Sequence, residues 1–558
     1  MKLTRRDLLW GAAGTAGLLV TPVPWKLLDD VSIWSQNWGW IPQPARGPVE
    51  VKQSFCTLCP QGCGMRVRMA SGWPVGVAGV ASHPFSRGAL CPLGFGAHQL
   101  NWHPRRLRTV RHGASSSSWE AARAAFAKAC SEGPVAIVDG YPGRAASSVF
   151  QTFVQEKKGS YRTVSSPETL SLAPYESWSG VPAAGMGYDL ENAQTIVSFG
   201  APLLDGWATP GRFTRLWAER AAGSADPQLR LIQVEASFSR TAARAWQWVP
   251  VHAGSEAALA AGVARVLLEE HLVPARGPMP PMTLAEAAGQ TGLSTGAIAD
   301  LARTMVARLP AVAIANDDNP AIAALNVVLG AAGARGGIVR KSKHAESYAS
   351  AADIGSARAV LIDSTVPWDF TPPTNAEVFR FAAWDGGSST ADWLLPAPGF
   401  LEELTDVPTA PASAIATYAV APSLLKASPE VQSAAQFLSG IDPALITVEK
   451  VIHARCADLF RGRVGTLQGQ EATPVAKFAS VQKLEEQLWR GAVWVDESPR
   501  SPAFRCELKE WPATAGPAQA VSSSENWSNA WRAPVLPPLA SKLYLESSLR
   551  EVPDRRNV

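Results

Sequence analysis

Four of the seven cysteines in this chain of 558 residues crowd into one short segment. They follow the spacing Cys56-x2-Cys59-x3-Cys63, and Cys91 follows after 27 intervening residues, directly before a proline. Three thiolates on a short glycine-containing loop can converge on one face of an iron-sulfur cubane, and a distant fourth thiolate completes the set. The spacing therefore predicts one [4Fe-4S] cluster bound by Cys56, Cys59, Cys63 and Cys91.

Two other uses of these cysteines stay open. Zinc sites favour paired C-x-x-C halves, and disulfides form in oxidising compartments. The other three cysteines, Cys130, Cys456 and Cys506, are scattered along the chain. Because a free cysteine packs like a small apolar side chain, we expect these three to be buried.

The charge around the cysteines supports a negatively charged cluster. No Asp or Glu occurs from Val51 to Trp119. The same segment contains the cations Lys52, Arg66, Arg68, Arg87, Arg105, Arg106, Arg108 and Arg111. A cationic field stabilises such a cluster and raises its potential; the last four arginines could instead form a docking face. The net charge of the whole chain, +3, is too small to indicate nucleic-acid binding.

The first 30 residues resemble a targeting segment. Arg5 and Arg6 precede an apolar run from Leu8 to Val20 that is broken by prolines. Twin-arginine signals direct proteins for export, and the run is shorter than the roughly 20 residues that a membrane-spanning helix needs. We expect export to the periplasmic side of a bacterial cytoplasmic membrane, with the signal cleaved or kept as an anchor. Because this route carries proteins that already hold their cofactors, it favours the cluster over zinc or disulfides.

After the cysteine segment, short apolar strands alternate with helices. The predicted strands are 135–138, 195–199, 229–234, 311–315 and 359–362, and the predicted helices between them are 119–131, 145–158, 213–222, 256–270 and 321–332. This alternation predicts an α/β fold with doubly wound parallel sheets. The predicted organisation is a signal or anchor (1–30), a linker (31–49), a cluster domain (50–112), α/β domains (113–410), a partly helical, irregular region (411–512) and an extended tail (513–558).

The cysteine segment resembles the N-terminal cluster domain of the molybdopterin oxidoreductase family. The resemblance rests on the cysteine spacing, on residues 82–92 (SHPFSRGALCP) and on residues 103–108 (HPRRLR). Weaker pieces that fit the family in order are 188–193, 239–242, 248–259, 391–396 and 536–544. The resemblance implies a small 4Fe-4S domain followed by doubly wound domains.

The chain departs from the catalytic pattern of that family at several positions. The lysine that usually follows the Cys-Pro pair and bridges cluster and pterin is replaced by Leu93, and Pro202 stands where an asparagine is usual. Glu235-Ala236-Ser237 replaces an acid-Pro-Arg run. The sequence after Glu403 has neither the length nor the strand pattern of the family's C-terminal β-barrel domain, so we expect that domain to be missing.

A molybdenum ligand is also hard to identify. Between Ser160 and Asp189 no cysteine occurs, and Ser171, Ser177 and Ser179 are candidates only by residue type. A two-pterin cofactor needs donors from several domains. We therefore expect one [4Fe-4S] cluster and no molybdopterin.

Members of the family without the pterin cofactor are subunits of alternative complex III and of the menaquinone reductase complex. The resemblance thus implies an electron-transfer or scaffold subunit of a membrane-associated respiratory complex. The implied partners are an iron-sulfur ferredoxin-like subunit, a membrane quinone-binding subunit and a c-type cytochrome. Two alternatives are a catalytic molybdenum or tungsten enzyme with a shortened chain, and a structural subunit whose cluster only clamps the fold.

Overall fold

The structure is a computed structural model, and it describes residues 4–20, 48–163, 166–204, 207, 210–224, 226–341, 354–363, 373–384, 391–496 and 505–513. The chain divides into two compact units, Met1–Val49 and Glu50–Val558. Most of the predicted linker (31–49) and of the tail (513–558) lies outside the described residues.

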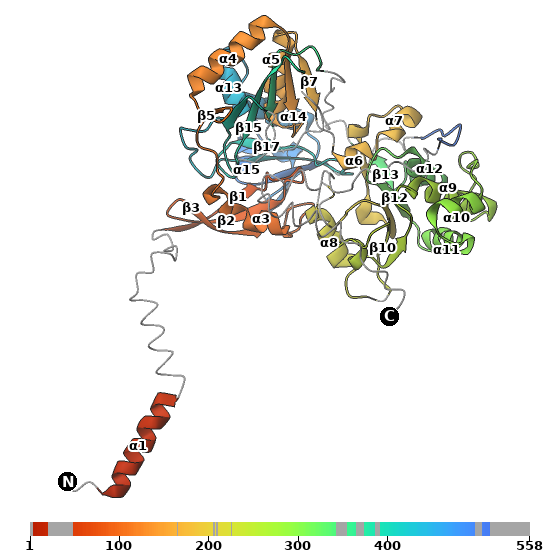
Figure 1. The fold of residues 1–558 in the computed structure, drawn as a ribbon, viewed down its shortest axis with the longest axis horizontal. Coiled ribbons are helices and arrows are strands. Elements are labelled where there is room, and N and C mark those ends of the chain that lie inside the picture. The colour runs from red at the N-terminus through yellow and green to blue at the C-terminus, as the bar shows by residue number, and fades with distance from the viewer. Residues whose placement is uncertain are drawn as a thin grey trace. The chain divides into compact units, whose positions relative to one another are not determined.

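The described part of the first unit is mainly one helix, α1 (Arg5–Val20) (Figure 1). Thr4 caps its start, because the Thr4 amide and hydroxyl both donate to the Asp7 carboxylate, at 2.9 and 2.5 Å. The apolar side chains of Leu8, Leu9 and Trp10 are exposed. Among the described residues, no helix combines the length and hydropathy that crossing a bilayer requires.

A small three-stranded sheet opens the second unit. Its strands are β1 (Val49–Phe55), β2 (Gly64–Ala70) and β3 (Trp73–Gly79), in the order β1-β2-β3. β2 and β3 form an antiparallel hairpin. Its turn uses Ser71 and Gly72, both with positive φ, as two-residue hairpin turns require. The short helices α3 (Pro92–Gly96) and η1 (Ala97–Trp102) follow.

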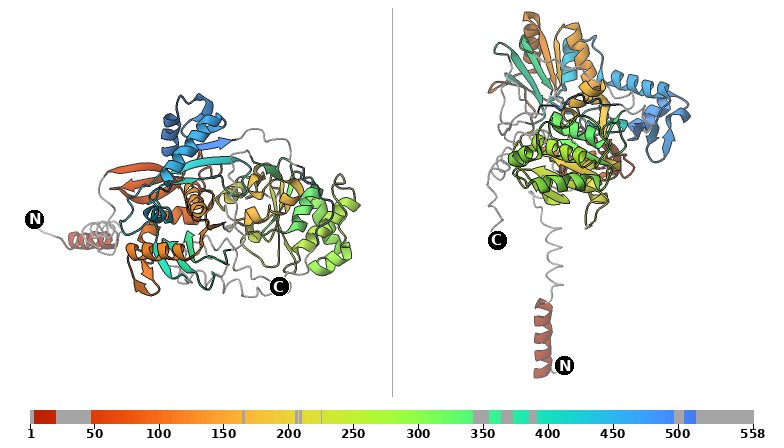
Figure 2. Two further views of the ribbon diagram at one scale, coloured as in Figure 1. Left: turned by 90° about the horizontal axis from the view of Figure 1, so that it is seen from above. Right: turned by 90° about the vertical axis from the view of Figure 1, so that its right-hand side faces the viewer.

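A seven-stranded sheet in the order β5-β4-β16-β15-β14-β6-β7 forms the next layer. Its strands are β4 (Arg111–His112), β5 (Ser115–Ser116), β6 (Val135–Asp139), β7 (Ser160–Thr163), β14 (Ala359–Asp363), β15 (Glu377–Ala382) and β16 (Trp393–Pro396). The strands from β7 to β16 pair in parallel, whereas β4 and β5 are antiparallel additions. Figure 2 shows the orange β6 region beside the teal β14 region, although more than two hundred residues separate them in the sequence.

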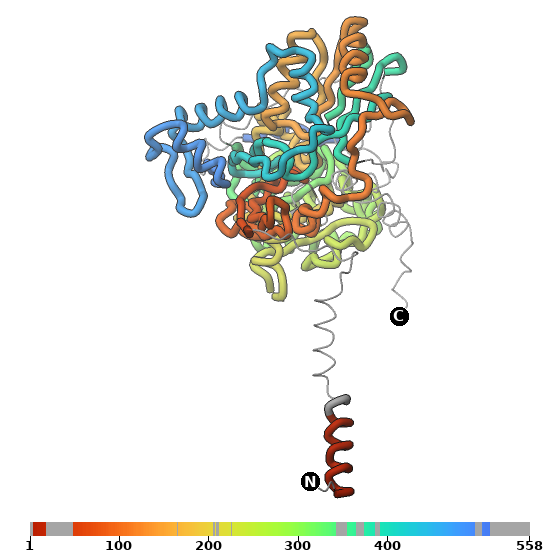
Figure 3. The backbone as a smooth tube through the Cα atoms, turned by 90° about the vertical axis from the view of Figure 1, so that its left-hand side faces the viewer, coloured from red at the N-terminus to blue at the C-terminus, as the bar shows by residue number. Residues whose placement is uncertain are grey.

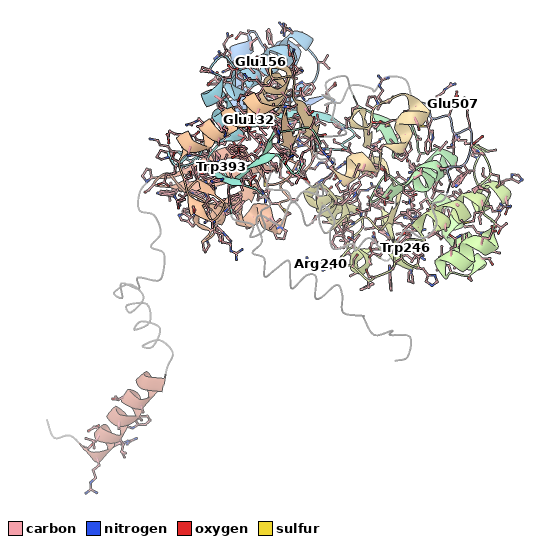
Figure 4. The ribbon with its side chains drawn as sticks, turned by 45° about the horizontal axis from the view of Figure 1, so that its top comes forward. Glu132, Glu156, Arg240, Trp246, Trp393 and Glu507 are labelled. Carbon is pink, nitrogen blue, oxygen red and sulfur yellow. The ribbon has the colours of Figure 1, made fainter. Side chains whose placement is uncertain are left out.

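Both faces of this sheet are covered. On one face Ile137 packs in an aromatic-rich core with α4 (Trp119–Glu132), α5 (Ala145–Glu156) and α13 (Ala434–Ile441). On the other face, Val138 packs with Ile354. Trp393, labelled in Figure 4, stacks between Phe379 and His112, with ring centroids 5.9 and 4.4 Å away, and so fixes the antiparallel edge.

Residues 166–341 are inserted between β7 and β14 and build a second parallel sheet, in the order β11-β10-β9-β12. Its strands are β9 (Thr195–Phe199), β10 (Arg230–Glu235), β11 (Gln247–Pro250) and β12 (Ala311–Ala315). The helices around it are α8 (Pro210–Arg220), α9 (Glu256–Glu269), α10 (Leu284–Thr291), α11 (Thr295–Val306) and α12 (Pro320–Leu329). Val197 and Ile196 belong to different cores, so this sheet too is covered on both faces. This is the doubly wound arrangement that the sequence predicted.

Shorter elements complete this inserted domain. They are α6 (Pro167–Leu170), α7 (Pro174–Ser179), η2 (Ala183–Gly185), η3 (Leu190–Asn192), η4 (Ala242–Arg244) and the antiparallel pair β8 (Met186–Tyr188) and β13 (Ile338–Arg340).

The region after residue 400 is more regular than expected. A five-stranded sheet in the order β17-β18-β21-β19-β20 is formed by β17 (Thr405–Val407), β18 (Ala416–Ala421), β19 (Thr466–Gln468), β20 (Ala472–Pro474) and β21 (Val493–Asp496). The segments α14 (Val448–Gly462), η5 (Val475–Lys477) and α15 (Val481–Trp489) lie between these strands in the sequence, near the blue end of the tube in Figure 3. The sequence analysis expected a partly helical, irregular region over 411–512 and missed these strands. The strands of the described region form an open sheet and no closed barrel.

Candidate metal centre

The loop between β1 and β2 carries the first three cysteines. The Cys56 amide donates to the Cys63 carbonyl at 2.8 Å, which closes the loop at its base. Gly62 has φ +60°, and a Cβ there would lie 2.0 Å from Cγ1 of Val407. Only glycine fits this position, because both the backbone conformation and the space exclude a side chain.

Helix α3 brings the fourth cysteine to the same place. Cys91 is its N-cap residue, and Sγ accepts a hydrogen bond from the Gly94 amide at 3.5 Å. A Cβ on Gly94 would lie 3.6 Å from Sγ of Cys56 and 3.9 Å from Sγ of Cys91. Two sulfurs that are distant in sequence therefore adjoin one glycine.

The four thiols form one electrostatic group. Burial and, to a lesser extent, the charge of Cys91 raise the pKa of Cys56 to about 12. Burial also raises the pKa values of Cys59 and Cys63 well above the usual range, and both respond to the charges of Cys56 and Cys91. Thiols of this kind do not ionise at neutral pH by themselves, so a bound metal must displace their protons.

Other observations bear on the kind of centre. All seven cysteines are free, so the four thiols form no disulfide. Within the described residues, no three His, Cys, Asp or Glu side chains are grouped closely enough to hold a single metal ion. The donor set, three thiols on a glycine-containing loop and one at the start of α3, fits an iron-sulfur cluster.

Of the three remaining cysteines, which we expected to be buried, Cys456 is buried, whereas Cys130 and Cys506 are only partly buried. Cys456 is buried in the core beneath the seven-stranded sheet, and Cys130 packs against the same core. Cys506 packs, partly buried, against the cores of the inserted domain.

His83 supports the cysteine loop, a role that sequence reasoning missed. Its Nδ1 accepts hydrogen bonds from the amides of Phe85 and Ser86, at 3.3 and 3.1 Å. Burial lowers the pKa of His83 to about 4, against the opposing effect of a hydrogen bond with the Gly62 backbone. His83 is therefore a neutral imidazole that ties the segment before Cys91 to the cysteine loop.

Gln61 joins the cysteine loop to the inserted domain, and sequence reasoning missed it as well. Its Oε1 accepts from the Arg212 amide at 2.9 Å. A Cβ on Gly211 would lie 2.9 Å from Nε2 of Gln61 and 3.2 Å from Sγ of Cys63, so α8 packs against the loop without a side chain. The only signal in the sequence is the position of Gln61 between two cysteines.

The cations of the segment divide into two groups. Arg66, Arg68, Arg87, Arg105 and Arg108 are exposed. Arg106, in contrast, is buried, pairs with Glu402 at 2.5 Å and lies over Trp384. From the sequence, Arg106 could have formed part of a docking face. This expectation is wrong, because its guanidinium pairs with Glu402 inside the protein.

The serines considered as molybdenum ligands are engaged in local hydrogen bonds. The Ser171 hydroxyl donates to the Glu168 carbonyl, and those of Ser177 and Ser179 donate to the carbonyls of Pro174 and Tyr175. Their arrangement supports structural roles.

Comparisons with known proteins match both the cysteine segment and the larger part of the chain. The family described as "Molybdopterin oxidoreductase Fe4S4 domain" matches residues 49–100. It is 31% identical over 365 residues to "Menaquinone reductase, molybdopterin-binding-like subunit" of Nitratidesulfovibrio vulgaris, covering 61% of this chain and 52% of that protein.

The chain also matches more distant relatives. The chain is 26% identical over 262 residues to "Formate dehydrogenase, nitrate-inducible, major subunit" of Escherichia coli, with 40% of this chain and 25% of that protein covered. It therefore spans about half or less of the curated relatives that it matches. The solved structure "Acetylene Hydratase from Pelobacter acetylenicus" shares the fold, with a TM-score of 0.57 at 12% identity over 80% of this chain and 74% of that one.

Proposed function

We propose that this chain is an electron-transfer or scaffold subunit of a membrane-associated respiratory complex, with one [4Fe-4S] cluster bound by Cys56, Cys59, Cys63 and Cys91. The convergence of three thiols on one glycine-containing loop with a fourth thiol at the start of α3 carries the proposal. A bound cluster of this type supplies one-electron transfer. The protein binds it through the thiols, shields Cys56 and Cys63 by burial and holds the loop with His83 and Gln61.

The proposed setting draws on the relative from Nitratidesulfovibrio vulgaris, whose name describes a subunit of a menaquinone reductase. We place the chain between quinone and cytochrome or iron-sulfur partners. The partners would be a ferredoxin-like iron-sulfur subunit, a membrane quinone-binding subunit and a c-type cytochrome. The twin-arginine pattern at Arg5 and Arg6 supports a location on the periplasmic side.

We further propose that molybdopterin is absent. Leu93 replaces the lysine that bridges cluster and pterin in catalytic relatives, and Pro202 and the run from Glu235 to Ser237 also depart from the catalytic pattern. A polyanionic cofactor of that size needs many donors, and these replacements remove several.

Metal analysis of the purified protein tests the proposal. We expect about four iron atoms per chain and negligible molybdenum or tungsten. Replacing Cys59 by Ser should lower the iron content, whereas Cys130→Ser, outside the centre, should leave it unchanged. Stoichiometric molybdenum with bound pterin would show a catalytic enzyme instead.

A further inference from the structure

Glu168 is a buried carboxyl group that cluster binding leaves unexplained. It lies on α6, and only 1% of the residue is exposed. Among the described residues, neither carboxylate oxygen has a hydrogen-bond partner at ordinary geometry, although the Ser166 hydroxyl and the Glu168 amide lie close enough to favour the charged form. Since burying a carboxylate without full partners is costly, such a group binds a proton readily.

The groups around Glu168 carry charges of both signs. η2 packs against α6, and the amide of the buried Lys341 donates to the Gly185 carbonyl of η2 at 2.8 Å. Burial and the charge of Arg212 lower the pKa of Lys341 to about 8. Arg212 also favours the charged form of Glu168, but it forms an ion pair with Glu191.

A chain of hydrogen bonds connects this place to the cysteine loop. The Arg212 amide donates to Gln61 at 2.9 Å, and its guanidinium donates to the Tyr188 carbonyl at 2.9 Å. The Tyr188 hydroxyl lies 2.9 Å from Oγ of Ser171, which donates to the Glu168 carbonyl at 2.9 Å. Burial raises the pKa of the Tyr188 phenol well above its usual range, so it does not ionise near neutral pH.

The charge of Glu168 also acts directly on a thiol of the metal centre. A negative Glu168 raises the pKa of Cys59, whereas in the described part of the chain no hydrogen bond or ion pair joins the two residues. Charges separated by buried protein interact more strongly than charges in water. Added negative charge at the cysteines therefore favours protonation of Glu168.

We propose that Glu168 is a proton-binding site whose occupancy follows the redox state of the cluster. The inference rests on the proposed electron-transfer role. For each electron that a one-electron donor of the complex delivers, the Glu168 carboxylate takes one proton from solvent and becomes a carboxylic acid. Oxidation reverses the step, so the buried region gains no net charge.

Redox titration of the purified complex at several pH values, followed by electron paramagnetic resonance of the cluster, tests this proposal. Burial raises the pKa of Glu168 to about 7. The reduction potential should begin to depend on pH at about this value. Above this pH, the reduction potential should fall by up to about 59 mV per pH unit, the value for one proton per electron. In Glu168→Gln the potential should no longer depend on pH in this window.

Two control variants assign the proton. Burial also raises the pKa of Glu403 to about 7, beside Arg144 and Asp363, so Glu403→Gln should keep the slope. Lys341→Met should keep it too, displaced to higher pH because a neighbouring cation is lost. A slope that survives in Glu168→Gln and disappears in either control would overturn the assignment to Glu168.

A second measurement needs no variant and therefore does not depend on folding of Glu168→Gln. Reduction of the wild-type complex should produce a carboxylic acid C=O band in infrared difference spectra. Reversible reduction with neither this band nor a pH-dependent potential would overturn the proton site and leave the electron-transfer role intact. A cluster that is not reduced in the range of quinones and cytochromes would overturn the electron-transfer role itself.

Discussion

Leu93 stands directly after the Cys91-Pro92 pair, partly buried in α3. In catalytic relatives, a lysine at this place lies between cluster and pterin. Leu93 has no donor, so under our proposal it only fills space. Volume-conserving exchange of apolar side chains costs less than about 1.5 kcal/mol, whereas an unpaired partly buried cation is costly.

We therefore expect Leu93→Met to preserve both quinone-linked electron transfer and the melting temperature of the complex. Leu93→Lys should lower the melting temperature without raising activity, because no anionic pterin is there to pair with the ammonium. Activity that increased in Leu93→Lys would indicate that a pterin is bound beside the cluster.

At this scale the sequence predicted the thiols but not their support. The spacing of Cys56, Cys59 and Cys63 in the sequence is enough to identify them as ligand candidates. Gln61 and Arg212 are 151 positions apart, and no local pattern connects an amide side chain to a distant backbone N–H. The buried carboxyl of Glu168 was missed for the same reason, since only the packing around α6 deprives it of partners.

Asp406 shows how one side chain joins separate elements. Helix α5 has no side-chain cap of its own, and the Ala145 amide at its start donates to the Asp406 carboxylate of β17 at 2.6 Å. The other oxygen of Asp406 accepts from Arg455 of α14, also at 2.6 Å. Strand β17 is thus tied to two helices by one fully buried carboxylate.

Asp406→Ala should lower the free energy of unfolding by about 3–5 kcal/mol, because it leaves Arg455 buried without its anion. Asp406→Asn should cost less, since its amide oxygen can still accept from the Ala145 amide. Chemical denaturation monitors both. The matched control Asp458→Ala removes an exposed ion pair with Arg461 and should change stability by less than about 1 kcal/mol; equal effects of the Asp406 and Asp458 variants would contradict this role.

The strands of the parallel sheets were predictable, because apolar runs such as Ala311–Ala315 are bounded by turns and buried on both faces. The five-stranded sheet was not. Several of its strands have only three residues, and β18 (Ala416–Ala421) is Ala-rich and buried throughout, without alternation. β18 pairs with β21, Ala416 opposite Asp496, so its partner is far away in the sequence.

For the whole molecule, the N-terminal arginines give a prediction about location. Replacing Arg5 and Arg6 together by Lys should leave the precursor in the cytoplasm, because the export receptor recognises the arginine pair itself. Cell fractionation measures the distribution. Replacing Lys2 by Arg, which leaves the pair unchanged, is the control, and efficient export of the double Lys variant would contradict the assignment.

The insertion of residues 166–341 between β7 and β14 has a consequence for how the chain folds. Arg144 and Asp363, which bond across the seven-stranded sheet, are 219 positions apart. Closing so long a loop is entropically costly and slows folding. During synthesis, β6 waits for β14 until most of the chain has left the ribosome, so its sheet edge stays unpaired for tens of seconds at about 5–20 residues per second. Chaperone protection in this interval would govern the yield of mature protein more than its final stability does.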